Sequence, residues 1–107
     1  MANSFKNAKA DLTTTDATTL YTVPSATTTI VKSILVSEDS GNADTITVTL
    51  TNASSAVFSL FKVKAVAANT TIELLTAPLV VTESEIIEVT AATAGRLHVV
   101  MSILEVS

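Results

Sequence analysis

The stretch Asp44–Asn52, DTITVTLTN, decides the fold that we expect for this chain. In it, Ile46, Val48 and Leu50 alternate with threonines. Successive side chains on a β-strand point to opposite faces, so this pattern places aliphatic groups on one face and hydroxyls on the other. Threonine is β-branched and favours an extended backbone without adding charge. The stretch therefore predicts a strand that is buried on one face only.

Similar segments recur along the chain and predict roughly seven or eight short strands separated by turn residues. Glu38–Asp44, EDSGNAD, is the clearest hairpin loop. No window shows the apolar period of a capped helix, so the sequence predicts an all-β fold. The expected architecture is an antiparallel β-sandwich, jelly-roll-like, around a mainly aliphatic core. Phe58 and Phe61 are expected to belong to this core. The other expected strands are Thr19–Val23, Thr28–Ser37, Val57–Val66, Ile72–Leu75, Leu79–Thr82, Glu85–Thr90 and Arg96–Val106.

Residues 1–15 differ from the rest, because they are polar and Phe5 is their only large apolar group. We therefore expect an extended N-terminal arm over residues 1–15 and a β-sandwich domain over residues 16–107. One interpretation of the arm is a frayed chain end. The other is a segment that docks on a neighbouring subunit, with Phe5 in a pocket and Lys6 and Lys9 against an acidic surface. The partner-binding residues predicted from the sequence are therefore Phe5, Lys6 and Lys9.

The composition favours a protein that is packed against other subunits. Charged residues make up 15% of the 107 residues, against about 25% in a typical globular domain. Hydrophobic residues reach 48%. Cores of protein interfaces are depleted of charge in the same way, so we expect a homo-oligomer or a larger assembly. The alternative is a monomer whose exterior is covered by threonine hydroxyls.

Charge and hydropathy exclude several other classes of function. The net charge is −4, and the only charged residues among the first ten are Lys6 and Lys9, so the rest of the chain is acidic. An acidic chain without a basic cluster does not follow a phosphate backbone, so we expect no nucleic-acid partner. No apolar stretch approaches the ~20 residues that cross a bilayer, so we expect a soluble protein with no membrane partner. The chain has no cysteine, which fits a reducing cytosol.

The sequence also predicts no catalytic residue, metal site or cofactor. His98 is the only histidine, and a surface or half-buried strand position explains it better than a catalytic base or zinc ligand. Glu83, Glu85 and Glu88 form a charged turn better than a pair of glycosidase carboxylates, because the chain has few aromatics to line a cleft. Residues 38–44 lack the ligand spacing of an EF-hand loop. We therefore expect a protein that is not an enzyme.

Three stretches together resemble a group of small virion structural proteins of tailed bacteriophages, particularly marine and cyanobacterial phages. They are TTLYTVPSATTTIVKSILVSEDSGNADTITVTLTN, LFKVKAVAANTTIELLTAPLVV and ESEIIEVTAATAGRLHVVMSILEVS, and they cover nearly everything from Thr18 onward. The resemblance implies a β-sandwich that decorates or cements a capsid, or that belongs to the tail. It carries over no catalytic residue.

From this resemblance we expect a capsid decoration protein that is made in the host cytoplasm and located on the surface of the virion. Its partners would be the major capsid protein and further copies of itself. One alternative is a tail fibre or baseplate component that binds a receptor or glycan. Another is a component of the head–tail connector, which copy number per particle would separate from a shell protein.

Overall fold

The computed structural model describes residues 3–107, and within this range it contains nine strands and no helix. Met1 and Ala2, the first two residues of the expected arm, lie outside the described residues. The strands are β1 (Asn3–Leu12), β2 (Thr18–Thr22), β3 (Thr28–Glu38), β4 (Asp44–Thr51), β5 (Val57–Val66), β6 (Thr71–Glu73), β7 (Leu79–Val81), β8 (Ile86–Ala91) and β9 (Leu97–Val106). Among residues 3–107, no helix is long and apolar enough to cross a membrane.

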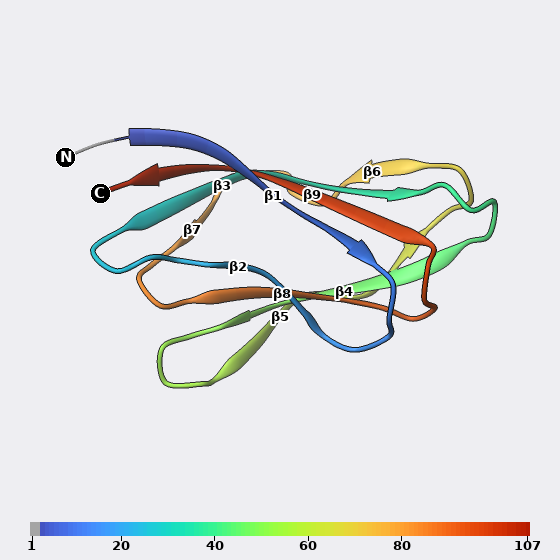
Figure 1. The fold of residues 1–107 in the computed structure, drawn as a ribbon, viewed down its shortest axis with the longest axis horizontal. Helices are drawn as coiled ribbons and strands as arrows, with labels where there is room; N and C mark the ends of the chain where they lie inside the picture. Colours follow the sequence, from blue (N-terminus) through green and yellow to red (C-terminus); the bar gives the residue numbers. More distant parts are fainter. Residues whose placement is uncertain (1–2) are drawn as a thin grey trace.

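The strands form two antiparallel sheets that pack face to face (Figure 1). The first sheet has the order β1-β9-β3-β6, and β7 pairs with the other end of β3. The second sheet has the order β2-β8-β4-β5. The predicted all-β antiparallel sandwich is therefore confirmed. The jelly-roll connectivity is not established by these strand orders and stays a prediction.

The core lies between the sheets, where every second side chain of β8 and β9, and of most of β3 and β4, is buried. In β9, Leu97, Val99 and Met101 are buried, while the residues between them face outward. In β4, Ile46 and Val48 are fully buried, as the alternation in DTITVTLTN predicts. The core thus consists mostly of aliphatic side chains supplied at period 2 by both sheets.

The sequence prediction missed β1 as a strand of the sandwich. Residues 3–12 pair with β9 along its whole length, from Asn3 opposite Val106 to Leu12 opposite Leu97. The structure therefore places this segment at the edge of the first sheet and not in an arm apart from residues 16–107 (Figure 1). The period-2 signal is weak here, because the positions that face the core include Ala8 and Ala10, which are small.

Candidate functional site

The first sheet exposes a face of low charge to solvent, which we call the outer face. Cross-strand partners in a sheet share a face. Phe5 lies opposite Leu104, Leu104 opposite Ile30, and Ile30 opposite Val80. These four side chains form one apolar row across four strands. Phe5 is 75% exposed and Val80 57% exposed.

A second row crosses the outer face farther along the strands. In it, Val100 and Leu35 lie side by side, with Lys9 beyond Val100 on β1 and Glu73 beyond Leu35 on β6. Both apolar side chains are more than a third exposed. The row between the two contains only the uncharged polar residues Asn7, Ser102 and Ser33. The outer face is thus mainly apolar or neutral, with opposite charges at the two ends of the second row and with Asp11 beside His98 in the row beyond it.

The second sheet has the threonine face that the sequence predicts. Thr45, Thr47 and Thr49 of β4 are half-buried and alternate with the buried side chains of Asp44, Ile46 and Val48. Neutral hydroxyls therefore line β4 on the solvent side of this sheet, where Glu88 of β8 lies opposite Thr49. The two sheets differ, because the outer face of the first sheet is apolar instead.

The edge strand β5 carries a second exposed apolar group, which we call the β5 patch: Val57, Phe58 and Val63. Phe58 is 53% exposed, so the prediction that it belongs to the core is wrong, whereas Phe61 does pack against the core. Phe58 lies opposite Leu50 near the end of this edge strand, and two register shifts interrupt the pairing of β4 and β5 between Ser59 and Lys64. Such irregularities re-aim side chains at sheet edges.

Val63 marks the most unusual backbone position of the β5 patch. Its φ is 51°, in the left-handed region that β-branched residues rarely adopt. The Val63 amide donates a hydrogen bond to Thr47 Oγ1 at 3.1 Å, which holds this part of β5 against β4. The strand edge is therefore kinked, and Val63 is held at the surface with 61% of its area exposed.

The three predicted partner-binding residues divide between the two faces of β1. Phe5 and Lys9 are on the outer face, and Lys9 Nζ donates to Asn7 Oδ1 at 3.4 Å. Lys6 has the opposite orientation and forms an ion pair with Glu105, 2.8 Å from Nζ to Oε1. Lys6 is thus engaged within its own domain, whereas Phe5 and Lys9 remain available on the outer face.

Glu105 also links the two sheets through Tyr21. Tyr21 Oη, from β2, donates to Glu105 Oε2 at 2.5 Å and lies 2.8 Å from Thr29 Oγ1. The ion pair with Lys6 and the hydrogen bond from Tyr21 lower the pKa of Glu105. Burial, followed by the hydrogen bond to Glu105, raises the pKa of Tyr21 to about 12. No feature of the local sequence indicated this contact, since the two residues are 84 positions apart.

We expect the single tyrosine to titrate with a midpoint near pH 12, instead of near 10 as in unfolded chains. The chain has one Tyr and no Trp, so ultraviolet absorbance near 295 nm reports on Tyr21 alone. The stability that the protonated phenol contributes is present below pH 10 and is lost as the pH rises through 12. Glu105→Gln should shift the midpoint of the Tyr21 titration to lower pH, because the hydrogen bond to the Glu105 carboxylate raises the pKa of Tyr21. A midpoint near 10, with native circular dichroism retained, would contradict the buried hydrogen bond.

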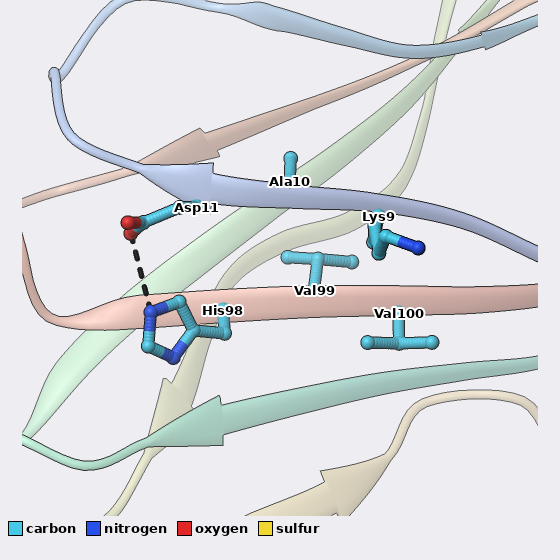
Figure 2. A pocket seen from close by; sticks show the side chains of 6 residues that line it. All are labelled: Lys9, Ala10, Asp11, His98, Val99 and Val100. Atoms are coloured by element: carbon cyan, nitrogen blue, oxygen red, sulfur yellow. Dashed lines mark ion pairs between the residues drawn. The ribbon is translucent and has the colours of Figure 1, made fainter.

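His98 occupies the half-buried surface position that the sequence predicts. Its Nε2 lies 3.3 Å from Asp11 Oδ1, and its Nδ1 lies 3.5 Å from Asp39 Oδ2. Figure 2 shows the shallow hollow beside it on the outer face, lined also by Lys9 and Val100. These contacts join β1 and the β3–β4 turn to β9. Among residues 3–107, no group of three or more His, Asp or Glu side chains is arranged to hold a metal ion.

The glutamates of the TESEIIE segment hold turns. Glu83 accepts a hydrogen bond from the Ala26 amide, and Glu85 accepts one from the Thr82 amide at 2.7 Å. Glu88 is on β8 and is half-buried. The predicted charged turn thus contains Glu83 and Glu85, whose carboxylates hold the backbone at Ala26 and Thr82.

A buried carboxylate in the acidic loop was missed. Glu38, which the sequence predicts to begin a hairpin loop, is 2% exposed. Its carboxylate accepts hydrogen bonds from the amides of Ser40 at 2.8 Å, Gly41 at 3.1 Å and Asn69 at 3.0 Å, and from the Ser40 hydroxyl. Glu38 therefore joins the β3–β4 and β5–β6 turns and has a structural role.

No family model and no curated protein matches the chain. Among the solved structures that are similar is that of Bacillus endospore appendages, which form a novel family of disulfide-linked pili. It covers 96% of this chain and 85% of the other chain, with a TM-score of 0.56 and 11% sequence identity. At this identity the similarity concerns the fold, and the chain shares its β-sandwich with the subunit of a pilus.

Proposed function

We propose that the protein is a non-enzymatic structural subunit of a repetitive assembly, and specifically a capsid decoration protein of a tailed bacteriophage. It would bind the major capsid protein on the surface of the virion and stabilise the shell. The general part of the proposal rests on the surface of the domain and on its fold. The specific part rests on the sequence resemblance to phage virion proteins.

The observation that carries the general proposal is the exposure of large apolar side chains in two groups. Four are on the outer face (Phe5, Leu35, Val80 and Val100), and three form the β5 patch. Large apolar side chains that are exposed along one sheet face or one edge strand mark interaction sites in soluble proteins. A subunit with two such surfaces can contact two neighbours at once, which is what a repetitive assembly requires.

The β5 patch suits contact with a different protein. It lies at a sheet edge, where unpaired backbone groups are accessible. Its bulges and the strained backbone at Val63 prevent regular pairing with another flat strand. A partner would instead contact Val57, Phe58 and Val63 as side-chain anchors. Repeated over a shell, an interface of the ordinary size of ~800 Å² per partner would raise the free energy needed to rupture the shell.

A second candidate function is a subunit of a homopolymeric fibre, which the fold similarity to a pilus subunit favours. The pili with the similar fold are disulfide-linked. This chain has no cysteine, so its contacts in a fibre would be non-covalent. Such a fibre would dissociate in denaturant without reductant.

Counting copies per purified phage particle by quantitative mass spectrometry tests the proposal. Symmetric shells present equivalent sites many times, so a decoration protein should occur on the order of hundreds of times per particle. Roughly six or twelve copies would indicate a tail or connector component, as in the alternative with a receptor- or glycan-binding role. Absence from particles, together with fibres of the pure protein in electron micrographs, would favour the second candidate and contradict capsid decoration.

We expect Phe58→Ser to lower the affinity for the capsid by about tenfold or more, because a truncated aromatic anchor typically costs this much. Sedimentation of labelled protein with capsids that lack it measures the change. Thr22→Ser, at the opposite edge of the same sheet, is the control and should bind like the wild type. Equal binding by Phe58→Ser and the wild type would remove the β5 patch from the capsid interface.

A further inference from the structure

We propose that two copies of this chain associate through the outer face, related by a two-fold axis that runs parallel to the strands of the first sheet. This inference deepens the proposed function and rests on it, because it names the surface through which copies of the subunit meet. The two first sheets would pack face to face, and the second sheets would point away from the dimer with their β5 patches free.

The apolar rows match themselves under this symmetry. A two-fold axis along the strands, between β9 and β3, leaves each row at the same position along the strands. It reverses the order of the residues in that row across the sheet. Phe5 then lies over Val80 of the second copy, and Leu104 lies over its Ile30. Likewise Val100 lies over Leu35 of the second copy. Each contact buries an apolar side chain that is half-buried or exposed in the single chain.

The charges on the outer face select this axis. Lys9 and Glu73 stand at opposite ends of one row, so the rotation places Lys9 over Glu73 of the second copy, and the reverse. Burial raises the pKa of Glu73, but hydrogen bonds from the Ser33 hydroxyl and the Ile34 amide outweigh it and lower the pKa overall. Glu73 is therefore ionised at neutral pH and can pair with the lysine.

The other charged positions on this face meet no like charge. Asp11 and His98 belong to a fourth row with Ser37 and Thr71, and the rotation places them over those two hydroxyls of the second copy. Lys32, at the bulge of β3, has a stem long enough for its ammonium group to reach the rim.

An in-plane axis perpendicular to the strands gives a poorer match. It exchanges the two apolar rows, so that Phe5 lies over Lys9 and Val80 over Glu73 of the second copy. Apolar groups would then cover charges and remove them from water without a partner, which is costly. The positions of the rows therefore favour the axis parallel to the strands.

The outer face is large enough for a stable dimer. Four strands ~4.8 Å apart and ~10 residues long cover on the order of 600 Å². A specific interface buries ~800 Å² of accessible surface per partner. The accessible surface of the outer face exceeds the projected area of the sheet, because the side chains protrude from it. Aligned packing of two sheets is also the arrangement that β-sandwiches use internally.

Sedimentation equilibrium of the full chain, with variants of two exposed phenylalanines, tests this inference. The wild type should exceed the monomer mass of 11.1 kDa and approach twice that value as the concentration rises. Phe5→Ser should weaken the dimer on the order of 100-fold, because each dimer loses two aromatic anchors. Phe58→Ser is the matched control, with a similarly exposed ring on the other sheet, and should dimerise like the wild type.

A charge reversal tests the orientation of the two copies. Lys9→Glu places a glutamate against Glu73 of the second copy and should weaken the dimer about tenfold at low salt, less at high salt. Lys64→Glu makes the same change on β5 and should have no effect. Circular dichroism checks that all four variants are folded.

Three outcomes would overturn the inference. They are a monomer at every concentration, a dimer that is lost in Phe58→Ser and kept in Phe5→Ser, and a dimer that Lys9→Glu strengthens or leaves unchanged. None of these three outcomes contradicts the proposed function if the protein still occurs in many copies per particle. Conversely, a dimer through the outer face with no copies on phage particles supports this inference and contradicts capsid decoration.

Discussion

Replacing Ile34 by Ala is expected to lower the free energy of unfolding by about 3–4 kcal/mol. Ile34 is fully buried in β3, the strand that pairs with β9, β6 and β7 in the first sheet. The shortened side chain leaves a cavity that the flanking strands cannot fill, so the lost burial and the cavity both contribute. For a domain of this size the change corresponds to a fall in Tm of about 15–25 °C.

Leu35→Ala is the matched control for this experiment. Leu35 is the next residue in the same strand, but its side chain is 38% exposed on the outer face. Its truncation should cost under about 1 kcal/mol in the monomer. Urea unfolding measures both variants, at low protein concentration so that dimerisation does not stabilise the native state. Equal losses would contradict the assignment of inner and outer faces in β3.

Glu38→Gln should produce the second large loss, on the order of 10 °C in Tm at pH 7. The carboxylate accepts hydrogen bonds from three backbone amides and one hydroxyl, which tie two turns together. An amide side chain offers one acceptor oxygen and places its own N–H donors against those of the turns. Buried donors would then lack partners.

The same carboxylate should contribute to acid unfolding. Burial raises the pKa of Glu38, but hydrogen bonds from Ser40, Asn69 and Gly41 outweigh it and lower the pKa to about 2. The ionised form is thus favoured by folding. Its contribution to stability is complete above the unfolded-state pKa, near 4.5, and is lost as the pH falls through 2.

Thermal unfolding followed by circular dichroism at pH 7, 4, 3 and 2 measures this effect. Tm of the wild type should fall more steeply below pH 4.5 than Tm of Glu38→Gln, because the variant has no group to protonate at this site. Glu88→Gln, on β8, controls for the loss of one charge and should follow the wild type. Parallel curves for wild type and Glu38→Gln would contradict the structural role of this carboxylate.

The sequence predicted the strands well where alternation is strong. DTITVTLTN became β4 over Asp44–Thr51, and Val57–Val66 became β5 with the same bounds. Asp44–Thr51 alternates hydroxyl and aliphatic side chains, and Val57–Val66 is rich in β-branched and aromatic residues between turn signals; these local features are sufficient to predict a strand. The sandwich follows, because each such strand has one face to bury.

The sequence could not predict features that depend on distant partners. Lys6 is tolerated on the inner side of β1 because Glu105, near the other end of the chain, pairs with it. Glu38 is buried because the Asn69 amide, 31 residues away, completes its hydrogen bonds. Phe58 is exposed although its partner Leu50 packs against the core, because β5 is the edge strand of its sheet and no strand lies beyond it.

The candidate surfaces were predicted only in part. Phe5 and Lys9 are on the outer face, as a partner-binding role for them requires, but they belong to a sheet and not to an arm. The sequence did not indicate that Phe5 aligns with Leu104, Ile30 and Val80, because the register between four strands decides this. In the β5 patch, Val63 lies at a register shift that no local motif marks.

The outer face and the β5 patch are both expected to be covered in the working assembly. Hydroxyl-radical footprinting with mass spectrometry measures this directly, by comparing the free chain with the chain in purified particles or fibres. Phe5 and Phe58 should react readily in the free chain, kept dilute enough to be monomeric, and several-fold more slowly in the assembly, while the half-buried Tyr21 should react equally in both. Unchanged reactivity of both phenylalanines on assembly would contradict this expectation.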